Sequence, residues 1–117
     1  MKVRVVVTTF ATFAALMIAG AAFAQDKAQI EKGLKAYDTY KCGMCHSIAG
    51  KGNVKGPLDG VGTKLKADEL KAWLVTPKEM TAKTKAARVP AMNANATLAK
   101  SPEDVDALVA YMLSLKK

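Results

Sequence analysis

The feature that most constrains this chain is the run Cys42-Gly43-Met44-Cys45-His46, which holds both cysteines and the only histidine. The spacing C-x-x-C-H is the attachment pattern for c-type haem. Two thiols this far apart can add across the two vinyl groups of a haem as thioethers, because the short chain between them lies against the edge of the ring. His46 then directs its imidazole at the iron. The motif predicts one covalent haem c, attached through Cys42 and Cys45 and coordinated by His46.

Three other kinds of site use parts of this motif. The two cysteines could form a disulfide in an oxidising compartment. A thioredoxin-like redox site places C-x-x-C in a βαβ unit, and no such pattern surrounds the motif. A structural zinc site needs four nitrogen or sulfur ligands, whereas the chain offers three, since it has no further cysteine or histidine. Haem attachment is therefore favoured over these alternatives.

The chain is poor in aromatic residues for its size. Its 117 residues are one-domain size, and all three phenylalanines lie within residues 1–24. Removing those 24 residues from the 117 leaves 93, with no phenylalanine, one tryptophan and three tyrosines. Such a small domain buries little apolar surface by itself, so a bound cofactor would complete its core. The short length excludes a large enzyme, and two cysteines exclude a disulfide-rich scaffold.

The first residues have the pattern of an export signal. Lys2 and Arg4 precede an apolar run that ends in Ala22-Phe23-Ala24, the small-x-small pattern at which signal peptidase cuts. We predict that residues 1–24 are a signal peptide cleaved after Ala24, and that residues 25–117 form the domain, located in the periplasm. Cleavage would lower the formal net charge from +8 to +6. The alternative is an uncleaved membrane anchor, because the run is nearly long enough to span a bilayer.

Apolar residues recur at helical spacing in several parts of the domain, and no stretch alternates as a strand does. We therefore expect helices over residues 27–40, 68–75 and 101–117, and essentially no sheet. The glycine-rich residues 49–63 have the composition of a loop.

Two helix starts carry capping signals. Thr76-Pro77-Lys78-Glu79 is a capping-box pattern and predicts a further short helix. Ser101 and Pro102 would cap and open the final helix, and Lys116-Lys117 would close it with the charge that the helix dipole favours.

Four blocks in order along the chain resemble the class I monohaem cytochromes c, an exported bacterial family. They are Gly33 and Tyr37 ahead of the haem motif, Gly56-Pro57-Leu58-Asp59-Gly60-Val61-Gly62, residues 73–92, and Leu108-Val109-Ala110-Tyr111-Met112. The resemblance covers residues 30–115. It implies an all-α, cytochrome c-like fold, with three to five helices and long loops around one covalently bound haem. The N- and C-terminal helices would cross near Gly33, with Tyr111 packed at the contact.

The same resemblance suggests residues that support the haem. The main-chain carbonyl of Pro57 would accept a hydrogen bond from Nδ1–H of His46 and so fix the ring that binds iron. Pro57 could instead be an ordinary loop breaker. Trp73 would contact the haem edge or a propionate, or would simply pack in the core.

The sixth ligand of the iron would be a methionine. Met44 lies inside the attachment loop, and Met112 lies on the core stripe of the last helix, so Met80 and Met92 remain. Met92 resembles the distal-loop methionine of the family, and Met80 is the second candidate. The soft, adaptable thioether would suit either position.

A haem iron with histidine and methionine ligands has no open coordination position and a raised reduction potential. We therefore expect a periplasmic one-electron carrier and not an enzyme. One alternative is a haem-bearing electron-transfer subunit of a periplasmic oxidoreductase complex. A second is an open-site haem protein that binds small ligands, which requires that neither methionine coordinates.

Cationic residues flank both the haem motif and the region of Met92: Lys41, Lys51, Lys83, Lys85 and Arg88. They predict electrostatic steering of acidic redox proteins. Alternatively, they only keep a small protein soluble. Nucleic-acid binding is not expected, because no basic run is interleaved with aromatics. We expect a monomer with no membrane anchor after cleavage.

Overall fold

The computed structural model of the protein describes residues 14–86, 92–93 and 95–117, with side chains from Asp26 onward. The predictions for residues 1–13 and Arg88 lie outside the described residues. In chain order the elements are α1 (Ala14–Thr39), the short 3₁₀ turn η1 (Cys42–Met44), β1 (Ser47–Ile48), β2 (Lys51–Gly52), α2 (Val61–Lys64), α3 (Ala67–Val75), α4 (Pro77–Thr84), α5 (Ala96–Ala99) and α6 (Pro102–Ser114).

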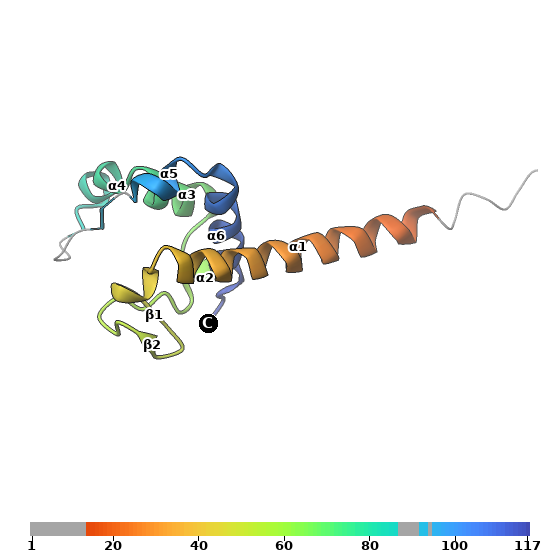
Figure 1. The fold of residues 1–117 in the computed structure, drawn as a ribbon, viewed down its shortest axis with the longest axis horizontal. Helices are drawn as coiled ribbons and strands as arrows, with labels where there is room; N and C mark the ends of the chain where they lie inside the picture. Colours follow the sequence, from red (N-terminus) through yellow and green to blue (C-terminus); the bar gives the residue numbers. More distant parts are fainter. Residues whose placement is uncertain (1–13, 87–91, 94) are drawn as a thin grey trace, which may run out of the picture.

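The predicted all-α fold is confirmed, with six helices in the described part where three to five were expected. Two of these, α2 and α5, are four-residue turns, too short to produce a hydrophobic period. Helix α1 starts at Ala14, well before the predicted residue 27, and its first half projects beyond the other helices (Figure 1). Cleavage after Ala24 would leave the half that packs against α6. Among the described residues, no helix is both long and apolar enough to span a membrane.

The crossing of α1 and α6 organises the fold, and it occurs at Gly33 as expected. A Cβ added to Gly33 would collide with the main-chain carbonyl of Ala107 and lie 2.5 Å from Cβ of Tyr111. One turn later on α1, the rings of Tyr37 and Tyr111 meet edge to face, with centroids 6.1 Å apart and planes at 70°. Only a glycine at position 33 allows the two backbones to approach this closely.

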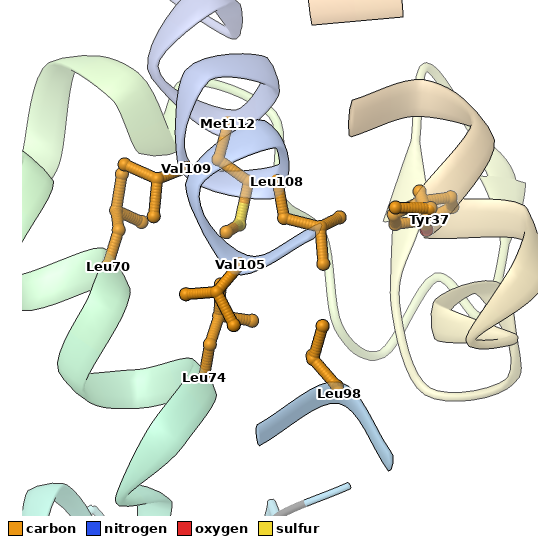
Figure 2. Close-up of a cluster of buried hydrophobic side chains, with 9 residues drawn as sticks. Tyr37, Leu70, Leu74, Leu98, Val105, Leu108, Val109 and Met112 are labelled. Carbon is orange, nitrogen blue, oxygen red and sulfur yellow. The ribbon is translucent and has the colours of Figure 1, made fainter. Parts of the chain in front are cut away.

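The core lies between α6 and the short helices that cover it. Leu70 and Leu74 of α3 and Leu98 of α5 are buried against the apolar face of α6. Figure 2 shows this arrangement, with the side chains of α3 and α6 pointing toward one another. The apolar face of α6 consists of Val105, Leu108, Val109 and Met112, and Leu108 and Val105 are each 1% exposed.

The expectation of essentially no sheet misses one small hairpin. Strands β1 and β2 pair antiparallel over two residues each. Ala49 and Gly50 between them both have positive φ, at 51° and 77°. This is the backbone of a tight hairpin turn, which a glycine-rich segment adopts easily. Strands of two residues are too short to show alternation, so the sequence pattern could not reveal them.

Three capping predictions are wrong in detail. The hydroxyl of Thr76 donates backward to the carbonyl of Ala72 at 3.2 Å and makes no cap bond to α4, although Pro77 opens that helix. Ser101 likewise makes no side-chain cap bond to α6. That helix ends at Ser114, so Lys116 does not close it. Instead, Nζ of Lys116 donates to the carbonyl of Gly62 at 3.0 Å, which ties the C-terminal segment to α2.

The crossing gives a direct test of the fold. Gly33→Ala should lower the free energy of unfolding by about 3 kcal/mol, because the new methyl group has no space between the two backbones. Gly43→Ala is the matched control, since a Cβ there would have no neighbour closer than 3.9 Å. Denaturant unfolding of both haem-loaded variants measures the difference, and equal stabilities would show that the contact at Gly33 is not tight.

Candidate haem-binding site

The haem motif follows directly from α1 and is tightly coiled. The main-chain amides of Cys45 and His46 both donate to the carbonyl of Cys42, at 3.1 and 2.9 Å. Lys41, just before the turn, has φ of 55°, which turns the chain sharply after the helix. As a result, Cys42 and His46 both line a cavity in the fold, while Cys45 lies exposed at the surface.

This cavity has a volume of about 260 Å³ and is partly open to solvent. Its walls are nearly all apolar and come from most elements of the domain. Helix α3 contributes Leu70, Trp73 and Leu74, and α6 contributes Leu108 and Met112. The remaining lining residues are Tyr37, Cys42, His46, Leu58, Val61, Leu65, Thr81, Ala86 and Met92.

The residues of the cavity fit a haem. An apolar wall suits the apolar face of the macrocycle, and an imidazole and a thioether are both haem-iron ligands. Cys42 lines the cavity, and Cys45 lies three residues later at the surface, with the spacing that is typical of haem c attachment. No group of three His, Cys, Asp or Glu residues that could hold a metal by itself occurs in the part of the chain that the structure describes.

The main-chain partner of His46 differs from the predicted one. Nδ1 of His46 lies 3.1 Å from the carbonyl oxygen of Gly56, and Pro57 is exposed. A carbonyl only accepts, so Nδ1 carries the proton and Nε2 keeps the lone pair that a metal needs. The prediction that the Pro57 carbonyl is the acceptor is therefore wrong by one residue.

The pairing of Ser47 with the loop explains this shift. The amide of Ser47 donates to the carbonyl of Gly56 at 3.0 Å, and its own carbonyl accepts from the amide of Leu58 at 2.8 Å. The two bonds straddle Pro57, which has no amide proton to offer. These bonds hold the Gly56 carbonyl against Ser47, the residue that follows His46.

Tyr37 supports the motif from α1 in a way that the sequence did not reveal. Its hydroxyl donates to the carbonyl of His46 at 3.3 Å. Burial, and then the nearby Cys42 thiol, raise the pKa of Tyr37, so the hydroxyl keeps its proton and remains a donor. Burial also raises the pKa of Cys42, which keeps that side chain a thiol at neutral pH. In the sequence, Tyr37 was marked by its place ahead of the haem motif, which gave no sign of this hydrogen bond.

Asn53 is a second supporting residue that sequence reasoning missed. Its main-chain amide donates to the main-chain carbonyls of Gly43 and His46, at 3.1 and 3.0 Å. Its side-chain Nδ2 donates to the carbonyl of Met44 at 3.1 Å. Asn53 thus holds the glycine-rich loop against the haem motif. Asparagine is common in turns, so its presence in this loop gave no signal of that role.

The two candidate sixth ligands differ in position. Met92 is half-buried and lines the cavity together with His46. Met80 is also half-buried, but it lies on α4 and does not line the cavity. Thr81, the next residue on α4, does line it. Trp73, for which core packing and haem contact were both considered, lines the cavity as well. The structure therefore brings Met92 and Trp73, and not Met80, to the same space as His46.

The cationic side chains near the site are free to face solvent. Lys41, Lys51, Lys83 and Lys85 are all exposed. The ion pairs within the described residues join Lys32 to Glu103 and Lys71 to Asp106, so none involves these four lysines.

Comparison with known proteins agrees with this site. A protein-family model described as cytochrome c matches residues 30–116, which include the haem motif, the loop that supports it, Met92 and all of α6. No match was found among curated proteins or among solved structures.

Proposed function

Because the chain belongs to the cytochrome c family and is thus a haem c electron-transfer protein, we propose that it is an exported carrier that moves one electron at a time with a single haem. The observation that supports this most is the shared cavity of His46 and Met92, which reach it from opposite ends of the domain sequence. Two such ligands would fill both axial positions of the iron and leave none for a substrate.

Each site residue has a distinct role in this proposal. Cys42 and Cys45 would attach the haem through thioether bonds, and His46 and Met92 would be the ligands that hold its iron. Bound haem supplies an iron that alternates between the ferrous and ferric states. The Gly56 carbonyl fixes the orientation of the His46 ring through Nδ1–H.

The walls of the cavity set the electronic environment. Apolar side chains from α3 and α6 exclude water, and a thioether ligand favours ferrous iron, so both raise the reduction potential. The protein provides ligands, dielectric and access, while the reactive centre belongs to the cofactor. A protein with these parts transfers electrons and has no catalytic residue of its own, so we propose that it is not an enzyme.

Export and partners complete the proposal. The basic start, apolar run and Ala22-Phe23-Ala24 ending support a signal peptide removed after Ala24, which places the domain in the periplasm. The exposed Lys41, Lys51, Lys83 and Lys85 support encounters with acidic redox proteins. Such a carrier would act as a monomer that meets different donors and acceptors in turn.

The ligand assignment is tested by two substitutions. Met92→Ala should remove the sulfur–iron absorption band, lower the midpoint potential and allow carbon monoxide to bind the ferrous protein, because the sixth position would be open. For a one-electron couple, each ~59 mV of lost potential changes the electron-exchange equilibrium tenfold. Absorption spectra and a redox titration measure these effects.

Met80→Ala is the matched control, since Met80 is half-buried like Met92 but does not line the cavity. It should leave the spectrum, the potential and the carbon monoxide response unchanged. If Met80→Ala shows the losses expected of Met92→Ala, and Met92→Ala shows none, Met80 is the ligand and the carrier proposal stands. If neither variant changes the spectrum, histidine–methionine ligation is wrong and an open-site haem protein is the better description.

Steering by the lysines near the site predicts a specific salt dependence. Electron transfer to anionic ferricyanide should slow steeply as salt rises, because the Debye length falls from ~10 Å at 0.1 M to ~3 Å at 1 M. Lys83→Gln with Lys85→Gln should flatten this dependence. Lys27→Gln with Lys35→Gln, on α1, removes the same charge and should flatten it less. Stopped-flow rates decide the point, and equal effects of both pairs would leave the lysines as solubilising charges only.

A further inference from the structure

Asn53 is bonded both to the main chain of His46 and to the segment that carries the acceptor of its imidazole. The main-chain amide of Asn53 donates to the carbonyl of His46 at 3.0 Å, and its carbonyl accepts from the amide of Gly56 at 3.0 Å. The carbonyl of Gly56 in turn lies 3.1 Å from Nδ1 of His46. These three hydrogen bonds form a closed circuit that begins and ends at His46.

The side chain of Asn53 makes two further bonds, which have different effects on this circuit. Oδ1 accepts from the main-chain amide of Lys55 at 3.0 Å, which shapes the turn that leads to Gly56. Nδ2 donates to the carbonyl of Met44 at 3.1 Å, which attaches that turn to the haem motif. The first bond lies within the loop, whereas the second joins the loop to the motif. Of the two, the second therefore places the Gly56 carbonyl relative to His46.

Gly52 allows Asn53 to come this close to the motif. Its φ is 103°, and a Cβ at this position would collide with the carbonyl oxygen of His46. Only glycine permits both the backbone conformation and the close approach. The chain thus passes the motif with no side chain in the way, and the next residue, Asn53, donates to three of its main-chain carbonyls, those of Gly43, Met44 and His46.

Gly56 is held at its two ends by different partners. Its carbonyl accepts from the main-chain amide of Ser47 at 3.0 Å, and its own amide donates to Asn53. A glycine has no side chain to restrict rotation about its backbone bonds, so the direction of its carbonyl depends on both contacts. Loosening the contact at Asn53 would let the carbonyl turn away from Nδ1 of His46.

From these contacts we infer that Asn53 is a positioning residue for the haem ligand: its Nδ2 keeps the Gly56 carbonyl at Nδ1 of His46 and so sets how strongly the imidazole donates to iron. The inference rests on the proposed function, because it takes His46 as an axial ligand. A hydrogen bond from Nδ1–H makes the imidazole a stronger electron donor, which favours ferric iron and lowers the reduction potential. Asn53 would thus oppose the thioether and the apolar walls, which raise the potential.

The test is the variant Asn53→Ser of the haem-loaded protein. A serine hydroxyl can still accept from the amide of Lys55, as it does in similar turns, but it is too short to reach the Met44 carbonyl. The Nδ1 proton of His46 should exchange with solvent about tenfold faster, because one bond fewer opposes local opening. The midpoint potential should rise, because the imidazole becomes a weaker donor. NMR of nitrogen-labelled ferrous protein measures the exchange, and a redox titration measures the potential.

Thr63→Val is the matched control. Oγ1 of Thr63 donates to the carbonyl of Lys116 at 2.9 Å, so this variant also removes one bond from a side chain to a main-chain carbonyl without changing the charge. Both variants should lower the free energy of unfolding. Only Asn53→Ser should change the exchange of the His46 Nδ1 proton and the potential, since a residue with a purely structural role would behave as Thr63 does.

A second variant, Asn53→Asp, keeps the length of the side chain and the acceptor for Lys55 but lacks the donor to Met44. Exchange of the His46 Nδ1 proton should therefore be faster in this variant as well. The inference is overturned if either variant keeps the exchange rate of the wild type while its stability falls. It is also overturned if the potential of Asn53→Ser falls, because the variant would then have admitted water to the cavity and not weakened the bond at His46.

Failure of the proposed ligand is distinguishable from failure of this inference. The nitrogen chemical shifts of the His46 imidazole are recorded first on the wild-type protein. A shift of Nε2 typical of a free imidazole would contradict the proposed ligand. The exchange comparison reports the contact between Nδ1 and the Gly56 carbonyl in either case, so it still decides whether Asn53 holds that contact.

Discussion

The close approach of α1 and α6 at Gly33 is the contact on which the site depends. It sets the distance between the haem motif, which follows α1, and the apolar face of α6, which forms one wall of the cavity. The edge-to-face contact of Tyr37 and Tyr111 then fixes the rotation of α1. In this orientation, Tyr37 can donate to the carbonyl of His46 while its ring lines the cavity. One glycine thus links the packing of two helices to the position of His46, the proposed haem ligand.

The glycine-rich loop, and not a helix, fixes the orientation of the His46 ring. A haem-binding imidazole needs a fixed ring plane and a defined tautomer, and both follow from an acceptor at Nδ1. The loop supplies that acceptor as the Gly56 carbonyl, and Ser47 and Asn53 hold the loop in register with the motif. The loop therefore has a structural function despite its lack of regular secondary structure.

The sequence predicted the main helices and the haem motif, because each leaves a periodic or fixed-spacing pattern, and the resemblance to the class I cytochromes c implied the crossing at Gly33. It did not predict the hairpin at Ala49 and Gly50, whose strands are too short for alternation. The family resemblance implied Pro57 as the acceptor for His46, whereas the acceptor is Gly56, because a backbone bond depends on the direction of a loop carbonyl, which no side chain encodes. The roles of Tyr37 and Asn53 were missed for a similar reason, since each bonds to a main-chain carbonyl brought near by folding.

The central claim is that Cys42 and Cys45 carry one covalent haem on an exported domain. The most direct test is the intact mass of the protein purified from the periplasm of a bacterium that assembles c-type cytochromes. We expect a single species that corresponds to residues 25–117 plus one haem, with the haem retained after acid–acetone extraction. Tandem mass spectrometry should place the haem on the peptide that contains both cysteines. A mass equal to residues 25–117 alone, with a dithiol or a disulfide in place of the two thioethers, would contradict the account.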